Sequence, residues 1–167
     1  MKIIVNVNKR WAIGRSGGLL YNIPEDMRFF RETTSGRTVV MGRTTLRSLP
    51  GGAPLKNRKN IILTHNPPED MTDAVFCKDL SELAQAIKKE NPDDVFVIGG
   101  GMIYKMMLPY CAEAYVTVVE DYSEGDAYFP DLDSDAEWHL SECSEKREYN
   151  GLKYEFRKYL NDNVREI

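Results

Sequence analysis

Asp26 is the acidic side chain whose surroundings point most directly to chemistry. Proline is tolerated in the first turn of a helix, so Pro24 predicts that a helix begins there or at Ile23. At helical spacing Asp26 shares a face with Phe30, and Met27 and Phe30 are neighbours. A carboxyl group beside large apolar side chains is desolvated, which raises its pKa and suits it to proton transfer. The alternative is an ordinary acid that stabilises a helix N-terminus, and these residues alone favour that alternative.

Three consecutive glycines at 99–101 separate an apolar strand from a helix. Glycine lets backbone N–H groups approach an anion, and a helix N-terminus favours negative charge. The pattern is not the dinucleotide fingerprint, because Tyr104 stands where a third glycine is needed, and it lacks the Lys-Ser or Lys-Thr pair of a P-loop. The turn either contacts a phosphate or is only a tight connection, and both interpretations stay open.

The tract from Thr33 to Pro68 contains no Asp or Glu, although the net charge of the chain is −4. Arginine matches phosphate and carboxylate groups with two parallel hydrogen bonds, so this excess indicates an anionic ligand. A strand–turn–helix junction at 42–45 offers a second anion site. The alternative is a solvated face whose acidic partners lie elsewhere, for which the loop 120–137 is a source. The basic residues of the tract are Arg37, Arg43, Arg47, Lys56, Arg58 and Lys59.

Two anion sites at the carboxyl ends of strands fit the rule for ligand binding in open α/β sheets. A cofactor with two phosphates would span them, and one acid beside such a cofactor indicates redox chemistry with a single proton transfer. No second carboxylate pairs with Asp26 in the sequence, and no Ser/His/Asp or Cys/His set has a specific spacing. His65 and His139 stand at no metal-ligand spacing from the cysteines, so we expect no metal.

The composition is that of a globular protein. The chain has 167 residues with 42% hydrophobic and 29% charged residues, which predicts one domain with a substantial core. The negative net charge argues against a nucleic-acid partner. Three widely spaced cysteines predict no disulfide framework, and the absence of a signal peptide or membrane-length apolar run predicts a cytoplasmic protein without membrane partners. No strong exposed apolar patch is expected, so a monomer is predicted.

The elements that must position these residues follow from hydrophobic periodicity and turn signals. We expect 8–20 to be a long, functional or mobile loop. In the tail, two alternating runs at 138–146 and 153–159 flank Asn150-Gly151, the favoured pair of a type I′ hairpin. Alternating strands and helices followed by a hairpin predict a mostly parallel sheet with an antiparallel edge. The predicted strands are 3–7, 38–41, 60–64, 74–76, 95–98 and 114–119, and the predicted helices are 24–33, a short one capped by Thr44 or Thr45, 79–90 with Asp79 as its cap, and 102–108.

Several motifs occur in an order and at spacings that resemble the dihydrofolate reductase family from residue 3 to about residue 160. Each motif alone is weak, and their combination is specific. They are Ala12-Ile13-Gly14, Asn22-Ile23-Pro24-Glu25-Asp26 with Phe30, Val40-Met41-Gly42-Arg43-Thr44-Thr45, Arg58-Lys59-Asn60-Ile61-Ile62-Leu63, Val97-Ile98-Gly99-Gly100-Gly101-Met102-Ile103-Tyr104 and Glu124-Gly125-Asp126-Ala127-Tyr128-Phe129-Pro130.

The resemblance implies an enzyme that reduces 7,8-dihydrofolate to 5,6,7,8-tetrahydrofolate with NADPH and binds antifolate inhibitors. It implies one α/β domain with a mostly parallel eight-stranded sheet, helices on both faces, a C-terminal antiparallel hairpin and an adenosine-binding subdomain at about 37–92. It also implies a cis peptide between Gly99 and Gly100.

The resemblance further implies roles for individual residues. Asp26 would hold the pterin and promote protonation of N5, with Tyr21 as the second catalytic residue. The residues implied to bind or support the substrate are Ile4, Val5, Met27, Phe30, Leu49, Arg58, Ile98 and Thr117, with Arg58 paired to the α-carboxylate of the glutamate tail. Those implied to bind the cofactor are Asn6, Ile13, Gly14, Leu19, Gly42, Arg43, Thr44, Thr45, Leu63, Thr64, His65, Lys78, Gly100, Gly101, Met102, Ile103 and Tyr104.

Four residues depart from the common pattern of the family. Tyr21 replaces a Trp that orders a water near the pterin, and Leu20 replaces a Pro in the mobile loop. Asn6 replaces a small Ala, so a polar side chain enters near pterin and cofactor. Met102 stands where a basic residue can help to bind pyrophosphate. Two other functions stay open: a reductase of the same fold that acts on a pyrimidine intermediate of riboflavin synthesis, and a binding module without catalysis.

Overall fold

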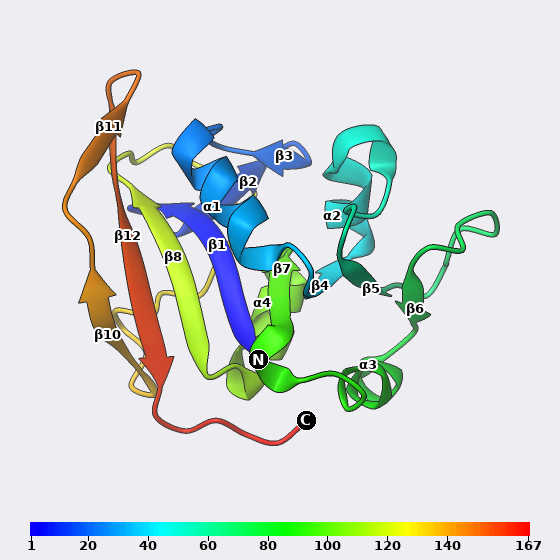
Figure 1. Cartoon of the computed structure of the whole chain (residues 1–167). Helices are drawn as coiled ribbons and strands as arrows, with labels where there is room; N and C mark the ends of the chain where they lie inside the picture. Colours follow the sequence, from blue (N-terminus) through cyan, green and yellow to red (C-terminus); the bar gives the residue numbers. More distant parts are fainter.

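A twisted sheet of nine strands forms the centre of the computed structural model, which describes residues 1–167. Its strands are β1 (Lys2–Asn8), β4 (Thr38–Gly42), β5 (Lys59–Leu63), β6 (Val75–Cys77), β7 (Val95–Gly99), β8 (Glu113–Val119), β10 (Trp138–Cys143), β11 (Arg147–Tyr149) and β12 (Leu152–Asn161). Eight strands follow the order β10-β12-β8-β1-β7-β4-β5-β6, and β11 extends the sheet beside β12 (Figure 1). The pairs from β8 to β6 are parallel, whereas β12 is antiparallel to β8, β10 and β11. The predicted parallel sheet with an antiparallel edge is confirmed.

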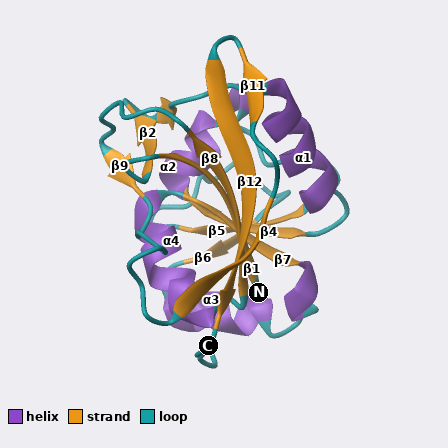
Figure 2. Cartoon of the chain, turned by 90° about the vertical axis from the view of Figure 1, so that its left-hand side faces the viewer, coloured by secondary structure: helices purple, strands orange, loops and turns teal.

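Helices cover both faces of this sheet because its central strands are apolar on both sides. They are α1 (Pro24–Thr34), α2 (Arg43–Ser48), α3 (Leu80–Ile87) and α4 (Gly101–Met107), and α1 and α4 lie on opposite sides of the sheet in Figure 2. In β4, Val39 and Met41 pack in the cluster that includes α1 and α2, whereas Val40 packs in the larger cluster with α3 and α4. The prediction of helices on both faces is therefore confirmed.

A second, three-stranded sheet includes two strands from the segment that was expected to be a loop. It consists of β2 (Ala12–Arg15), β3 (Gly18–Leu19) and β9 (Ala127–Tyr128), in the order β3-β2-β9. The prediction of an irregular 8–20 was wrong, because β2 forms its ladder with β9, more than a hundred residues away. Local periodicity carries no signal for such a pairing.

The helix boundaries test the predicted caps. Helix α1 begins at Pro24 with Ile23 as its N-cap, as predicted, and the Asp79 side chain caps α3 by accepting from the Glu82 N–H at 2.9 Å. The predicted Thr44 or Thr45 cap of α2 is wrong, because the helix follows β4 directly and Gly42 occupies the N-cap without a side-chain bond. Helix α3 ends at Ile87, earlier than expected, and α4 begins at Gly101, one residue earlier.

The C-terminal hairpin turns at Asn150-Gly151, where both residues have positive φ of 48° and 79°. These angles fit the predicted type I′ turn between β11 and β12. The run 138–146 was expected to be one strand, but β10 ends at Cys143 and β11 begins at Arg147. All the cysteines are free thiols, and no helix is long and apolar enough to cross a membrane.

Candidate active site

Two hydrogen-bond donors from neighbouring strands hold the Asp26 carboxylate. Asn6 Nδ2, on β1, donates to Asp26 Oδ2 at 2.9 Å, and Thr117 Oγ1, on β8, donates to Asp26 Oδ1 at 2.6 Å. Asn6 and Thr117 are direct partners in the parallel pair of β1 and β8. We call Asp26, Asn6 and Thr117 the carboxylate clamp. Because each carboxylate oxygen accepts more than one hydrogen bond, the clamp leaves acceptor positions on both oxygens free for a ligand.

The pKa of Asp26 is set by opposing effects. Burial raises the pKa of Asp26 most strongly, the hydrogen bonds from Thr117 and Asn6 lower it, and the charge of Glu25 raises it again. The net pKa is above the ordinary value, as predicted from desolvation. Met27, the apolar neighbour of Asp26 on α1, is itself 44% exposed. Asp26 is both a first-turn acid of α1 and a clamped carboxylate, so the two interpretations do not exclude each other, and its role in proton transfer stays a prediction.

Tyr104 connects the triple-glycine turn to β1. Its hydroxyl donates to the Ile4 carbonyl at 2.8 Å, and its ring lies against Gly99, where a Cβ atom would be 3.1 Å from the ring. Burial, and then the charge of Asp26, raise the pKa of Tyr104, so it stays protonated. The residue that breaks the dinucleotide fingerprint therefore packs under the turn. The peptide between Gly99 and Gly100 is cis, as the resemblance implied.

The two predicted anion turns meet at the carboxyl ends of the adjacent strands β4 and β7. A Cβ atom on Gly42 would lie 3.0 Å from Ile103, and a Cβ atom on Gly100 would lie 3.5 Å from Thr45 Oγ1. Both turns enter helices, so their backbone N–H groups face the same region. This juxtaposition suits a ligand that carries more than one phosphate.

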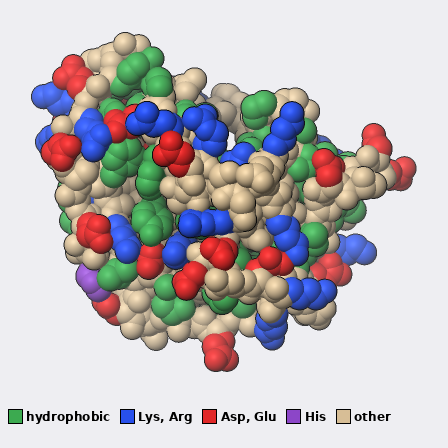
Figure 3. Space-filling model, viewed as in Figure 1, with side chains coloured by type: hydrophobic (Ala, Val, Ile, Leu, Met, Phe, Trp, Pro, Cys, Tyr) green, Lys and Arg blue, Asp and Glu red, His purple; other side chains and the backbone are tan.

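A cleft of about 200 Å³ opens beside these turns. Figure 3 shows the surface hollowed between the part that contains α1 and β3 and the part that contains α2, with basic side chains beside the hollow. Its predicted lining residues are Val5, Asn6, Ile13, Gly14, Leu19, Thr44, Thr45, Ile98, Gly100 and Tyr104. The lining residues absent from the predicted binding set are Arg15, Gly17, Gly18, Ser48, Gly99, Asp126 and Ala127.

Asp126 is the most informative of the missed residues. Its Oδ2 accepts from the Ser16 N–H at 2.8 Å, and its own N–H donates to the Gly14 carbonyl at 3.0 Å. It thereby holds the glycine-rich turn of β2 and β3 over the cleft. The only signal in the sequence was its place in the motif 124–130, which carries no local indication of this contact.

The basic tract divides into two sets. Arg37 forms an ion pair with Asp94, and Lys59 forms one with Glu90. Neither partner comes from the loop 120–137, so that alternative source of acidic partners is not used. The remaining basic residues of the tract, Arg43, Arg47, Lys56 and Arg58, form no ion pair. These cations fit a ligand with anionic groups.

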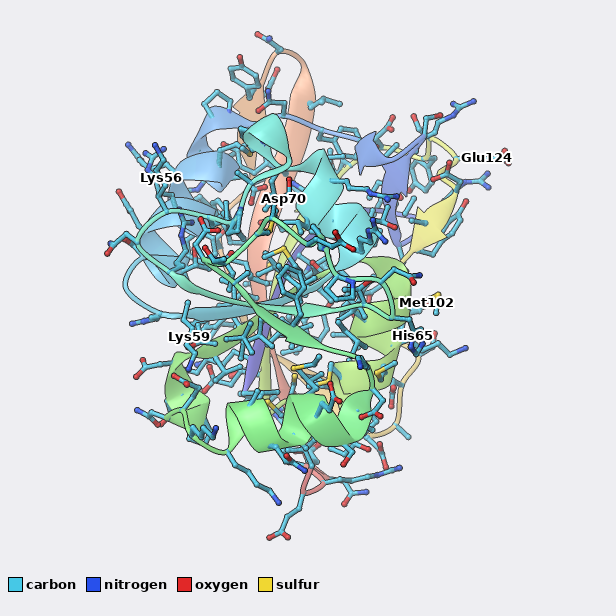
Figure 4. All side chains as sticks on the ribbon, turned by 90° about the vertical axis from the view of Figure 1, so that its right-hand side faces the viewer. Lys56, Lys59, His65, Asp70, Met102 and Glu124 are labelled. Atoms are coloured by element: carbon cyan, nitrogen blue, oxygen red, sulfur yellow. The ribbon has the colours of Figure 1, made fainter.

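The other predicted cofactor residues lie at the ends of β5, β6 and β7. Leu63 ends β5, and Thr64 donates its N–H to the Cys77 carbonyl at 2.8 Å, so Thr64, His65 and Lys78 share one edge of the sheet. In Figure 4 His65 and Met102 lie on the same side of the molecule, opposite Lys56 and Lys59. Met102 is 81% exposed in the first turn of α4, after Gly101.

The remaining predicted substrate residues surround α1 and the start of β5. Phe30 and Leu49 pack against the cluster that contains Ile4 and Ile98. Arg58 is held by Thr34, whose Oγ1 accepts from Nη1 at 3.1 Å. Burial and the nearby Arg31 lower the pKa of Arg58.

Tyr21 does not direct its hydroxyl to Asp26. The hydroxyl donates to Asp121 Oδ2, and it accepts from Asn8 Nδ2 at 3.2 Å. Burial and the hydrogen bond to Asp121 raise the pKa of Tyr21 to about 12. Tyr21 therefore joins the end of the segment 8–20 to the loop after β8, and its catalytic role stays a prediction.

Comparisons with known proteins agree with this geometry. The family model described as "Dihydrofolate reductase" matches residues 1–161. The chain is 35% identical to the dihydrofolate reductase of Bacillus subtilis (strain 168), over 90% of this chain and 88% of that protein, and 34% identical to that of Staphylococcus haemolyticus, over 95% and 94%. The structure resembles dihydrofolate reductase from Enterococcus faecalis complexed with NADP(H) and RAB-propyl, with a TM-score of 0.84, 28% identity, and 96% and 95% of the two chains covered.

Proposed function

This chain belongs to the dihydrofolate reductase family, and we propose that Asp26 is the residue on which its catalysis depends. The enzyme reduces 7,8-dihydrofolate to 5,6,7,8-tetrahydrofolate with NADPH. The observation that carries the role of Asp26 is its placement: it is the acid that β1 and β8 hold by two hydrogen bonds beside the cleft.

Asp26 acts on the pterin in two ways. Its free acceptor positions bind two neighbouring N–H groups of the pterin ring, which fixes the ring for hydride transfer to C6. Its raised pKa keeps a proton available, which promotes protonation of N5. NADPH supplies the hydride when it is bound. The apolar side chains of Val5, Ile13 and Ile98 line the cleft and exclude water from the reacting atoms.

The cofactor side consists of the two turns and the sheet edge beside them. We assign the phosphates of NADPH to the backbone at 42–45 and 100–103, with Arg43, Thr44 and Thr45 on the adenosine side. The ends of β5 and β6 extend this side through Leu63, Thr64, His65 and Lys78. The nicotinamide end reaches the cleft lined by Asn6, Ile13, Gly14 and Leu19. The unpaired guanidinium of Arg43 supports this assignment.

The substrate side extends from Asp26 along α1. Ile4, Val5 and Ile98 offer backbone groups to the pterin, while Met27, Phe30 and Leu49 contact or support the remainder of the substrate. Arg58 binds the α-carboxylate of the glutamate tail, because its guanidinium forms no ion pair within the protein. Tyr21 contributes by fixing the loop that ends at the pterin site.

A turnover assay tests these assignments. Loss of nicotinamide absorbance with 7,8-dihydrofolate and NADPH, abolished by a tight antifolate, is the expected result. Cofactor binding without turnover would indicate a binding module, and turnover only with a pyrimidine substrate would indicate the riboflavin-type reductase. We also propose that the protein is a monomer and that it works in the cytoplasm, and the free thiols support the proposed compartment.

A further inference from the structure

Asn6 combines two properties that no other residue of the site shares. It lines the cleft, and its amide donates to the acid of the clamp. An apolar side chain at this position could donate no such bond. The amide oxygen of Asn6 accepts no hydrogen bond within the protein, so the Nδ2 contact to Asp26 is the side chain's only internal bond.

The geometry of the clamp gives this contact a definite effect. Asn6 and Thr117 are cross-strand partners, so one donor approaches each carboxylate oxygen from the same layer of the sheet. A carboxylate held at both oxygens cannot rotate freely about its Cβ–Cγ bond. The free acceptor positions of the Asp26 carboxylate therefore have a fixed orientation before a ligand binds.

We propose that Asn6 is a positioning residue for dihydrofolate reduction, which fixes the plane of the Asp26 carboxylate and favours its ionised form. This inference rests on the proposed role of Asp26. A hydrogen bond to a charged acceptor is stronger than one to the neutral acid, so the Asn6 donor opposes the effect of burial. The direction of its contribution to the pKa of Asp26 is downward.

Other titratable groups face Asp26 from the elements packed around it. Glu25 precedes it on α1 and is itself bound by Arg147 on β11 and Tyr154 on β12. Tyr104 faces it from α4. None of these groups contacts Asp26 by a hydrogen bond, so changing Asn6 leaves their own pairings intact.

The test compares Asn6→Ala with Asn6→Leu, which keeps the branched shape of the side chain but has no donor. The pKa of Asp26 is measured in the ligand-free protein from the carboxyl ¹³C resonance, assigned with Asp26→Asn. Both variants are expected to raise the midpoint by roughly one pH unit, the effect of losing one hydrogen bond to a charged group. Asn163→Ala, which removes an amide donor from the exposed Glu137, is the matched control and is expected to leave the midpoint unchanged.

Hydride-transfer rates measured against pH provide the second readout. Because the rate falls when Asp26 loses its proton, both variants are expected to keep their plateau rate to higher pH than the wild type, even where the plateau is lower. A role in packing alone predicts a normal midpoint for Asn6→Leu. Unchanged midpoints of the Asp26 titration in both variants would overturn the inference. A wild type without turnover would overturn the proposed function, and the titration would then still test the effect of Asn6 on Asp26. If Asn6→Leu fails to fold, Asn6→Ala and Asn6→Val decide, since neither side chain carries a donor.

Discussion

The carboxylate clamp and the phosphate side of the cleft are built on opposite principles. In the clamp, Asp26 already has a donor at each oxygen, and Thr117 is only 2% exposed. On the phosphate side, Arg43 has no acidic partner and Met102 is 81% exposed. The Asp26 carboxylate is thus oriented by the protein itself, whereas the Arg43 guanidinium has no partner within the protein. Under the proposed function, the group that takes part in the reaction is held before binding, and the groups that supply affinity obtain their partner from the ligand.

The strongest test of this comparison is Asp26→Asn. It keeps the shape of the side chain but removes the ionisable group, so we expect hydride transfer at neutral pH to fall by on the order of a hundredfold or more. Single-turnover measurement with NADPH and dihydrofolate determines this rate. An unchanged rate would show that Asp26 serves only the helix N-terminus. Glu25→Gln is the matched control, since it removes the neighbouring acid and leaves the clamp in place.

On the phosphate side, Arg43→Ala should act on binding alone. Loss of one guanidinium that pairs with phosphate is expected to weaken NADPH binding about tenfold, with hydride transfer unchanged at saturating cofactor. Cofactor titration by fluorescence at two salt concentrations measures the effect, which should decrease at high salt. Lys56→Ala should have no effect, because Lys56 belongs to the same acid-free tract but lies on the side of the molecule opposite His65 and Met102 in Figure 4. A lower hydride-transfer rate of Arg43→Ala at saturating NADPH would show that Arg43 affects the reaction as well as binding, which would contradict the proposed difference between the clamp and the phosphate side.

Arg58→Ala should raise the KM for dihydrofolate about tenfold, because the α-carboxylate of the glutamate tail loses its partner. The sharpest control changes the substrate. A dihydropteroate without the glutamate should be reduced equally well by the wild type and by Arg58→Ala. An equal loss with both substrates would mean that Arg58 acts through its bond to Thr34 and supports the fold near the end of α1.

The smallest expected effect is on thermal stability. The Tm should change when Asp26 in the clamp is replaced and stay the same when Arg43 on the phosphate side is replaced. The pKa of Asp26 is raised on folding, so its favourable contribution is full below the ordinary carboxyl pKa and is lost as the pH rises through the raised value. Asp26→Asn should therefore unfold at a Tm about 3 °C higher at neutral pH, for a gain of about 1 kcal/mol, with no gain in acid. Thermal unfolding against pH measures this. Arg43→Ala should leave the Tm of the ligand-free protein unchanged, and Glu25→Gln should lower it, because Glu25 binds Arg147 and Tyr154.

The sequence predicted the features of the site that depend on neighbouring residues. Pro24 marked the start of α1, and the glycines at 99–101 marked a strand-to-helix turn, because each signal is local. The clamp could not be predicted, because the contact of Asn6 with Asp26 needs the placement of α1 against β1, and the place of Thr117 beside Asn6 needs the register of β1 against β8. The β2–β9 pairing was missed for the same reason. Motifs therefore indicated residues that line the cleft, while the pairing of distant strands determined which of them touch.

The small sheet of β3, β2 and β9 limits how the cleft can open. Strand β2 is held on both sides, so the movable part is short: the tip formed by Gly17, Gly18 and Leu19, of which Leu19 is 70% exposed. Few bonds must break for this tip to lift, namely the two-residue pairing of β3 and the exposed contact of Ser16 with Asp126. Lifting of this tip needs only local fraying, and loop motions of this kind fall on the microsecond-to-millisecond scale, so we expect the cleft to open without displacement of the whole segment 8–20.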